Sequence, residues 1–309
     1  MKRIEVLCER AIEDILHLMG GVPDGLADLK SRIWGLLWYA LDGKHRSIVF
    51  ENLATAFSET MDLQERRLLA RKVMARLMRM FFDMGRYLRL DSKELEARFR
   101  VEGIENIRSA LNRGKGVLAL TAHFGTWELL PVAAALADLP VSIVYRPLDF
   151  APLDRVIARL RTRFGAELIP SSRGAMRPIL RALSKGRIVA MLMDQNVDWY
   201  EGVWVDFFGK PACTNKGMAV IARKTGAPVV PVFLLPDGNH RWNVCFQPEL
   251  SLSISRDKTI DIETNTALYT RVIEGMIRRY PDQWFWVHQR WKTANACLLP
   301  QNAGGCKGP

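Results

Sequence analysis

Short apolar runs alternate with amphipathic stretches between about residue 100 and residue 280. The apolar runs are bounded by turn residues and predict buried strands at 117–122, 141–145, 167–169, 187–193, 229–235 and 242–246. The intervening stretches carry apolar residues three and four apart and predict helices at 104–112, 127–137, 153–164, 175–185, 216–225 and 261–280. Strands that alternate with helices predict an α/β fold, with a mixed, largely parallel central sheet flanked by helices.

The sequence before about residue 100 predicts helices. Residues 1–60 form loosely amphipathic helices with a break near Gly20 and Pro23, and 63–90 has apolar residues recurring every four positions, which predicts one long helix. Ile33–Leu41 (IWGLLWYAL) is apolar with two tryptophans and basic flanks. It either lies in a membrane interface or docks on the core. No run in the sequence reaches the roughly 18 apolar residues that would span a bilayer.

These patterns divide the chain into three parts. They are an N-terminal helical membrane-associating region at 1–60, an α/β domain at 61–295, and a tail at 296–309 that is expected to be disordered. The region 196–214 is rich in Trp, Tyr, Phe and Gly without a clear period, and we expect a loop that buries its aromatic side chains or offers them to an acyl chain.

A histidine and a glutamate flank the turn after the predicted strand 117–122. His123 follows the strand, and Glu128 comes five residues later. Five residues of α-helix rotate a side chain by roughly 140°, so His123 is expected outside the helix that begins near Trp127. An imidazole held by a carboxylate can deprotonate a hydroxyl, and free N–H groups at a helix start can stabilise an oxyanion. These are the parts of a base-assisted acyl transfer. The competing interpretation is a capping histidine and a solvated glutamate.

Polar side chains follow two further predicted strands. Arg146 follows 141–145, and Asp194 and Gln195 follow 187–193. Ligands of open α/β sheets gather at the carboxyl ends of strands, so these side chains and His123 are expected to converge on one crevice if the strands are neighbours. The competing interpretations are a surface ion pair of Arg146 with Asp149 and a capping role for Asp194.

The net charge and the cysteines limit the classes of partner and of site that the chain can have. The formal net charge is +11, and 146–187 holds ten Lys and Arg against three acidic residues. This predicts an acidic partner, namely an anionic membrane or an acidic carrier protein, because no nucleic-acid-binding signature is present. The five cysteines include no C-x-x-C, and H-E-x-x-H is absent, so neither a disulfide framework nor a metal site is expected.

Several motifs in order along the chain resemble the late acyltransferases of lipid A assembly, within the wider glycerolipid acyltransferase superfamily. The motifs are HFGTWE (123–128), YRP (145–147), R-x-R-F-G ending at Gly165, DQN (194–196), DFFGKPA (206–212), GAPVVPVF (226–233) and PDQWFWVHQRWKT (281–293). As a set they are far more specific than any one of them. The chain departs from the family's pattern at Ala122 and Thr126, where the family often has asparagine.

The resemblance implies an O-acyltransferase with a catalytic dyad of His123 and Glu128 and with substrate contacts from Arg146 and Asp194. It implies no cofactor. The donor would be an acyl thioester, either acyl carrier protein or acyl-CoA, and the acceptor a hydroxyl of a lipid A precursor. It also implies a peripheral or monotopic protein at the cytoplasmic face of the bacterial inner membrane.

The mechanism that we expect is direct transfer without a covalent acyl-enzyme, since no G-x-S-x-G elbow is present. His123 deprotonates the acceptor, Glu128 fixes its tautomer, and the backbone near Gly125 and Thr126 holds the oxyanion. Gln195 is expected to contact substrate. The alternatives are another glycolipid, lysophospholipid or aminolipid acceptor, a thioester hydrolase, and a non-catalytic membrane-surface binding protein. Acyl chain length and oligomeric state are left open by the residues.

Overall fold

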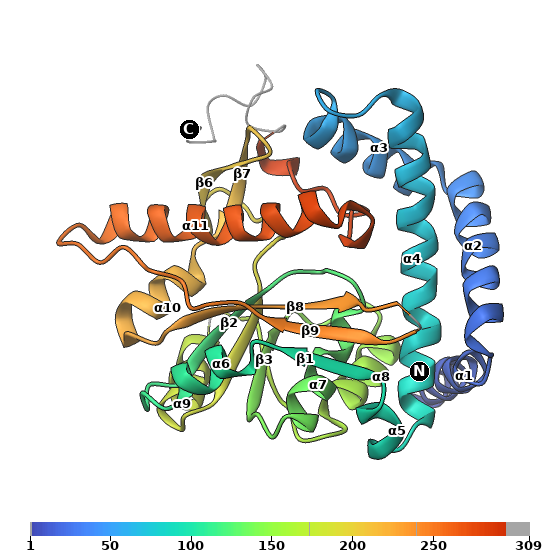
Figure 1. Ribbon diagram of the computed structural model, residues 1–309, viewed down its shortest axis with the longest axis horizontal. Coiled ribbons are helices and arrows are strands. Elements are labelled where there is room, and N and C mark those ends of the chain that lie inside the picture. The colour runs from blue at the N-terminus through green and yellow to red at the C-terminus, as the bar shows by residue number, and fades with distance from the viewer. Residues whose placement is uncertain (1, 173, 239, 295–309) are drawn as a thin grey trace.

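The computed structural model describes residues 2–172, 174–238 and 240–294, and its centre is a mostly parallel β-sheet (Figure 1). Within the described residues the sheet has seven strands in the order β1-β9-β8-β2-β5-β3-β4. The strands are β1 (Phe99–Glu102), β2 (Val117–Thr121), β3 (Val141–Tyr145), β4 (Glu167–Pro170), β5 (Ile188–Leu192), β8 (Val229–Pro236) and β9 (Trp242–Phe246). Neighbours are parallel except for β8 and β9. The predicted α/β class is therefore confirmed.

Helices cover both faces of this sheet. They are α6 (Ile104–Leu111), α7 (Leu130–Leu136), α8 (Ala151–Thr162), α9 (Met176–Ser184), α10 (Gly217–Thr225) and α11 (Lys258–Arg279). Successive side chains of a strand point to opposite faces. Leu118 and Leu120 of β2 accordingly pack in the layer of α9, α10 and α11, whereas Val117 and Ala119 pack in the layer of α6, α7 and α8. Burial on both faces explains why β2 is a continuous apolar run.

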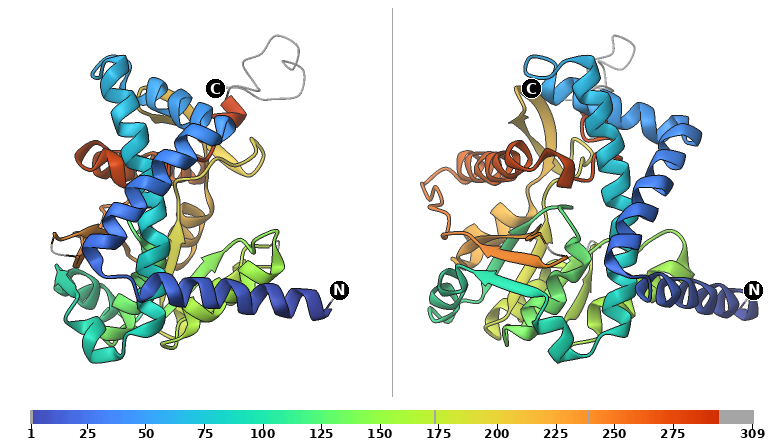
Figure 2. Two further views of the ribbon diagram at one scale, coloured as in Figure 1. Left: turned by 90° about the vertical axis from the view of Figure 1, so that its right-hand side faces the viewer. Right: turned by 45° about the vertical axis from the view of Figure 1, so that its right-hand side comes forward.

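The N-terminal helices pack beside the sheet rather than on its faces. They are α1 (Lys2–Gly20), α2 (Asp24–Leu41), α3 (Gly43–Phe57), α4 (Leu63–Arg89) and the short α5 (Ser92–Glu96). Helix α4 stands across the end of β8, and α1 and α2 lie against its outer side (Figures 1 and 2). A Cβ at Gly20 would lie 2.2 Å from the backbone of Gly85. The two glycines therefore let α1 and α4 cross in backbone contact.

Helix α2 has one docked face and one exposed face. Ala27, Ser31 and Gly35 recur every four residues and are buried, and a Cβ at Gly35 would lie 2.6 Å from the backbone of Ala75 in α4. On the other side, Ile33 and Leu37 remain about half exposed. The docked interpretation of the run 33–41 therefore holds for the side of the helix that carries Gly35, and the membrane interface stays a prediction for the exposed side. Among the described residues, no helix combines the length and apolarity needed to cross a bilayer.

The aromatic region that we expected to be a loop is instead a hairpin. β6 (Gly202–Phe207) pairs with β7 (Lys210–Asn215) in an antiparallel ribbon. Phe207 contacts Trp284 and Trp291, and Phe208 contacts Trp286, so these side chains belong to the protein core. The hairpin was missed because its strands alternate too weakly to show a period of two. Cys297, Cys306 and the tail 296–309 lie outside the described residues.

Candidate functional site

The candidate site begins at the end of β2, where the chain turns sharply. His123 lies two residues after the strand and outside any helix, as predicted, and the 3₁₀ helix η1 (Trp127–Leu129) follows. Gly125 has φ of +59°, and a Cβ there would lie 2.4 Å from the carbonyl oxygen of Leu234. Only glycine fits such a turn without strain. The turn therefore fixes His123 at the carboxyl edge of the sheet.

Asp194 is the carboxylate that contacts the imidazole of His123. Nδ1 of His123 lies 2.9 Å from Oδ1 of Asp194, and the backbone N–H of His123 donates to Oδ2 at 3.1 Å. Trp284 Nε1 donates to the same Oδ2 at 2.8 Å. β2 and β5 are paired with Thr121 opposite Leu192, and both functional residues lie two positions further on. The register of the sheet thus brings the two side chains together.

The charge of Asp194 is stabilised although its side chain is fully buried. Burial raises the pKa of this carboxyl, but His123, His288 and the Trp284 hydrogen bond together lower the pKa below its ordinary value. An ionised carboxylate is an acceptor only, and its other two partners, the His123 N–H and Trp284 Nε1, are donors as well. The proton on His123 therefore lies on Nδ1, and Nε2 is left with a free lone pair.

Two aromatic rings lie beside the imidazole of His123. Trp127 and Phe285 lie with ring centroids 5.1 and 5.8 Å from that of His123. The side chain of His123 is nevertheless 18% exposed. Its Nε2 has no hydrogen-bond partner among the residues that the structure describes. The imidazole is therefore held rigidly, with a free base atom in a partly apolar surrounding.

Glu128 has a different partner from the one that we expected. Its carboxylate accepts two hydrogen bonds from Arg161, at 2.7 and 2.6 Å, and a third from Trp127 Nε1 at 3.1 Å. Within the described part of the chain, no hydrogen bond or ion pair joins Glu128 to His123. The contact assigned to Glu128, which orients the imidazole, is made by Asp194.

Arg161 and Glu128 form a largely buried bidentate pair. Their side chains are 14% and 9% exposed. Burial lowers the pKa of Arg161, but the charge and hydrogen bonds of Glu128 raise it above its usual value overall. Such forked pairs have fixed geometry as well as strength. Glu128 is therefore a positioned anion next to the site.

An apolar cavity of about 70 Å³ opens beneath this pair. Glu128, Arg161 and Trp127 line one part of it, and the remaining lining is almost wholly apolar. Five neighbouring strands, β3, β5, β2, β8 and β9, contribute lining side chains together with α6, α7 and α8, so the cavity runs across the sheet. Four steps between neighbouring strands correspond to roughly 19 Å. Small side chains at Ala119 and Ala190 leave the space above the central strands.

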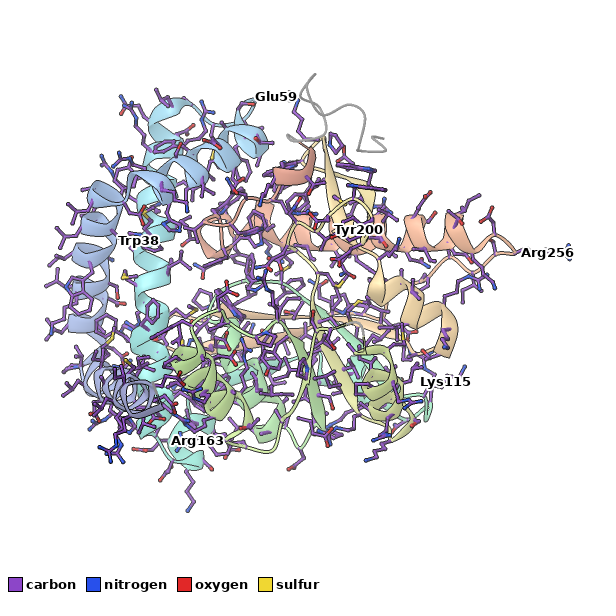
Figure 3. The ribbon with its side chains drawn as sticks, turned by 180° about the vertical axis from the view of Figure 1, so that it is seen from behind. Trp38, Glu59, Lys115, Arg163, Tyr200 and Arg256 are labelled. Carbon is purple, nitrogen blue, oxygen red and sulfur yellow. The ribbon has the colours of Figure 1, made fainter. Side chains whose placement is uncertain are left out.

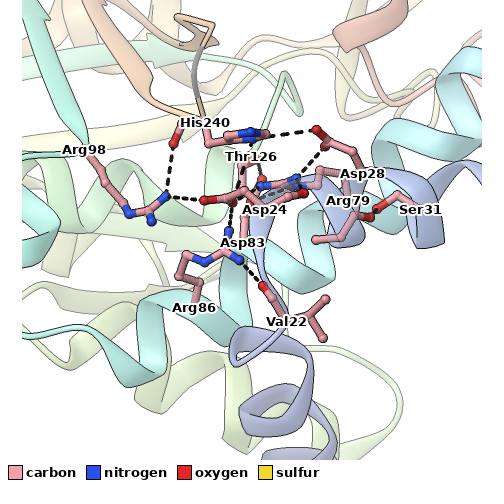
Figure 4. Close-up of polar contacts among 11 residues, drawn as sticks. Val22, Asp24, Asp28, Ser31, Arg79, Asp83, Arg86, Arg98, Thr126 and His240 are labelled. Atoms are coloured by element: carbon pink, nitrogen blue, oxygen red, sulfur yellow. Dashed lines mark hydrogen bonds and ion pairs between the residues drawn. The ribbon is translucent and has the colours of Figure 1, made fainter.

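The turn between His123 and Glu128 is braced from α4. Thr126 Oγ1 donates to Asp83 at 3.2 Å, and Asp83 accepts from Arg79 at 2.9 Å. Burial raises the pKa of Asp83, while Arg79 and Arg86 lower it only in part. Arg79 also binds Asp24 and Asp28 of α2, as Figure 4 shows. The N-terminal helices are thereby connected through α4 to the backbone of the site.

Gly125 does not offer the oxyanion donor that the sequence suggested. Its N–H donates to the carbonyl of Gln283 at 2.8 Å. The N–H of Gly125 therefore serves the turn, and an oxyanion site formed by the backbone N–H groups near it stays a prediction. The hydroxyl of Thr126 is likewise engaged, with Asp83.

Arg146 and Gln195 do not join the cluster. The strands before them are neighbours as expected, because β3 lies beside β5 and β5 beside β2. The Arg146 side chain is 80% exposed, however, and pairs with Asp149 at 3.6 Å, which was the competing interpretation. Gln195 is exposed. Only His123 and Asp194 of the four side chains converge. Among the residues that the structure describes, no group of three or more His, Cys, Asp and Glu could hold a metal ion.

Two residues of the site, Arg161 and Trp284, were not predicted as site residues from the sequence. Arg161 lies four positions after Ile157 and one after Leu160, on the buried face of α8. A single arginine on the apolar face of a helix was the available signal. Trp284 lies far from Asp194 in sequence, and nothing local connects it with that carboxylate. It belongs to the segment 281–293, whose sequence indicated a family motif but no partner for Asp194.

Comparison with known proteins gives independent evidence of the family to which the chain belongs. Residues 15–293 match the family described as bacterial lipid A biosynthesis acyltransferase. The chain is 28% identical over 253 residues to the lipid A biosynthesis lauroyltransferase of Escherichia coli K12, covering 81% of this chain and 80% of that protein. It is 24% identical to the lipid A biosynthesis acyltransferase of Haemophilus influenzae, over 90% of this chain and 85% of that one. A phosphatidylinositol mannoside acyltransferase of Mycolicibacterium smegmatis is 26% identical over 72% of each chain.

Proposed function

This chain belongs to the bacterial lipid A biosynthesis acyltransferase family and is an acyltransferase, and we propose that it transfers a fatty acyl chain from an acyl carrier protein thioester to a hydroxyl of a lipid A precursor. The observation that carries this proposal is the state of His123. Asp194 holds the proton on Nδ1, so Nε2 is the free base that a hydroxyl acceptor requires.

The proposed reaction is a direct transfer. Nε2 of His123 takes the proton of the acceptor hydroxyl as its oxygen attacks the thioester carbonyl. The C–S bond then breaks, the imidazolium returns the proton to the leaving thiolate, and an ester and a thiol result. Asp194 stabilises the imidazolium throughout, as the carboxylate does in Ser-His-Asp enzymes. Asp194 acts through His123 and is a positioning residue.

The acyl chain is proposed to occupy the apolar cavity that runs across the sheet. Its lining suits a hydrocarbon, and its one polar part is the Glu128–Arg161 pair beside Trp127. The thioester would lie at this polar part, near His123, because the ring of Trp127 touches both the imidazole and the cavity. Glu128 therefore keeps a place in the catalytic machinery, held by Arg161 at the reacting group.

The acceptor is proposed from the relatives. Two of the similar proteins are named for lipid A biosynthesis, and a third for a phosphatidylinositol mannoside. Both names refer to glycolipids. A lipid A precursor is the first candidate, and a glycosylated phospholipid is the second, supported by the similarity to the mannoside enzyme.

Membrane attachment is proposed for α1 and α2. Exposed apolar side chains on these helices include Ile4, Leu7, Ile15 and Leu18 in α1. The equivalent side chains of α2 are Leu26, Leu29, Ile33, Trp34, Leu36, Leu37 and Leu41. An apolar helix face with basic flanks suits the interface of an anionic membrane. The protein would lie at the cytoplasmic face of the inner membrane, where a carrier protein and a lipid precursor can both reach it.

The test is incubation with a set of acyl carrier protein thioesters and lipid A precursors, followed by mass spectrometry. We expect a precursor that is heavier by one acyl group and free carrier thiol in equal amount. Free fatty acid without acceptor would identify a hydrolase instead. Binding to vesicles without turnover, unaffected by His123→Ala, would identify a non-catalytic membrane protein and overturn the proposal.

A further inference from the structure

Most charges of the basic segment 146–187 are already engaged within the protein. Arg155 binds Glu5 and Glu9 of α1, and Arg159 binds Glu9 and Glu13. Arg161 binds Glu128. Arg163 donates to the backbone carbonyls of Tyr87 and Leu90, and Arg187 pairs with Glu167 at 3.2 Å. The segment therefore offers far less free charge to a partner than its sequence suggests.

Among the described residues of the segment, the free charge that remains is concentrated along α9 and at its C-cap residue. Arg177, Arg181 and Lys185, which we call the α9 stripe, are four residues apart and all exposed. Within the described residues, none of the three forms an ion pair, and the sequence of α9 contains no acidic residue. Like charges four apart on a helix repel each other and destabilise the helix. No acidic side chain of the described residues forms an ion pair that would offset this repulsion.

The stripe has a defined position relative to the site. The chain leaves β4 at the carboxyl edge of the sheet, where His123 also lies, and enters α9 a few residues later. From Arg177 to Lys185 the stripe extends for about 12 Å along the helix, away from that edge. Helix α9 lies across the molecule from α2 and α4 (Figure 1). A view from behind also places Trp38 of α2 and Lys115, next to the end of α9, on opposite sides (Figure 3).

We propose that the α9 stripe is the docking surface for the acidic carrier protein that presents the acyl thioester. This inference rests on the proposed function, since it names the surface that receives the proposed donor. The stripe offers three cations in a row to an acidic helix or loop. It begins at the edge where the thioester must arrive, and α9 lies across the molecule from α2, one of the helices proposed for the membrane (Figure 1). Docking there leaves the membrane side free for the lipid acceptor.

The experiment compares charge reversal on the stripe with charge reversal elsewhere. The variant is Arg177→Glu with Arg181→Glu. The matched control is Lys210→Glu with Arg271→Glu, which changes the net charge equally at exposed cations without an ion pair among the described residues. Each protein is assayed with a dodecanoyl chain on acyl carrier protein and with the same chain on coenzyme A. Binding of dodecanoyl acyl carrier protein is also measured directly, at low and high salt.

We expect the stripe variant to lose about tenfold or more in kcat/KM and in affinity for the carrier thioester, a size typical of electrostatic steering. Its kcat/KM with acyl-CoA and its affinity for anionic vesicles should match those of the control. An equal loss with both donors, or none with the carrier, would overturn the docking assignment. A loss of vesicle binding alone would assign the stripe to the membrane instead. If the unmodified protein transfers no acyl group from either donor, the proposed function fails, while the binding measurement still decides the docking surface.

Discussion

His123 and Asp194 contact each other twice, once through the imidazole and once through the backbone N–H of His123. Thr121 of β2 and Leu192 of β5 are opposite each other in neighbouring parallel strands, and each functional residue lies two positions after one of them. Because the sheet fixes both backbones, the geometry of the pair depends on strand register rather than on a flexible loop. The double contact sets the position and the tautomer of the imidazole together.

Replacing Asp194 with asparagine tests this role. The amide N–H₂ would turn toward Nδ1 and favour the tautomer with its proton on Nε2, which cannot act as a base. We expect kcat to fall by about 10²- to 10⁴-fold. Trp284→Phe is the control, because it removes one donor to Asp194 and leaves the charge, so kcat should change much less. An unchanged kcat in Asp194→Asn, measured on a protein with wild-type secondary structure, would contradict the assignment.

A double-mutant cycle tests the partner of Glu128. We expect Arg161→Met alone to lower the free energy of unfolding by about 3–5 kcal/mol, since it leaves a buried carboxylate unpaired. Combining it with Glu128→Gln should restore part of this loss, giving a coupling energy of about 1–3 kcal/mol. Urea unfolding of the four proteins measures it. Additive effects of the two substitutions would show that the pair does not act as a unit.

The sheet could be predicted from the sequence because its strands are short apolar runs between amphipathic helices. All six predicted strands and six predicted helices are present, with bounds shifted by at most three residues. Strand β1 and the hairpin β6–β7 were missed. Phe99–Glu102 contains two charged residues and pairs only with β9 at the edge of the sheet, so it lacks the apolar run of a buried strand.

The site was predicted in part, and the part that failed depends on side-chain direction. The order of the strands was enough to predict that Asp194 lies near His123. The same argument failed for Arg146, because its long side chain turns to solvent and to Asp149. For Glu128, spacing could place the residue near the turn but could not distinguish His123 from Arg161 as its partner. Arg161 is 33 residues away and comes from another helix.

Thr126→Val tests whether α4 positions the turn of the site. The substitution keeps the shape and removes the hydroxyl that donates to the buried Asp83. We expect the free energy of unfolding to fall by about 1–2 kcal/mol. We also expect kcat to fall more than KM rises, since the turn carries both His123 and Glu128. Thr162→Val is the control, because its hydroxyl bonds only within α8 on the surface. Equal kcat in both variants would remove Asp83 from any positioning role.

His288 should make stability dependent on pH. Burial lowers the pKa of His288 from 6.5 to about 4, although Asp194 opposes the shift. Among the described residues, its Nε2 is buried without a hydrogen-bond partner, and its Nδ1 lies 2.6 Å from the Phe285 carbonyl oxygen. Between pH 4 and pH 6.5, His288 of the unfolded chain takes up a proton that His288 of the folded chain does not. Stability is therefore fully present above about pH 6.5 and falls by about 3 kcal/mol toward pH 4. Urea unfolding of His288→Asn should show a smaller slope across this window. A slope equal to that of the wild type would contradict the prediction.

Adding charge to the exposed face of α2 tests membrane attachment. Ile33 and Leu37 lie four residues apart and are 46% and 52% exposed, so Ile33→Glu with Leu37→Glu should leave thermal stability nearly unchanged. Fully burying one such side chain contributes about 1.5–3 kcal/mol, and about half of each is left to bury, so losing two should weaken binding to phosphatidylglycerol vesicles by about tenfold or more. Ile254→Glu with Ile260→Glu is the control, because it makes the same chemical change at exposed isoleucines outside α1 and α2. Vesicle sedimentation measures both. Equal loss in the two variants would mean that general charge, rather than the face of α2, governs attachment.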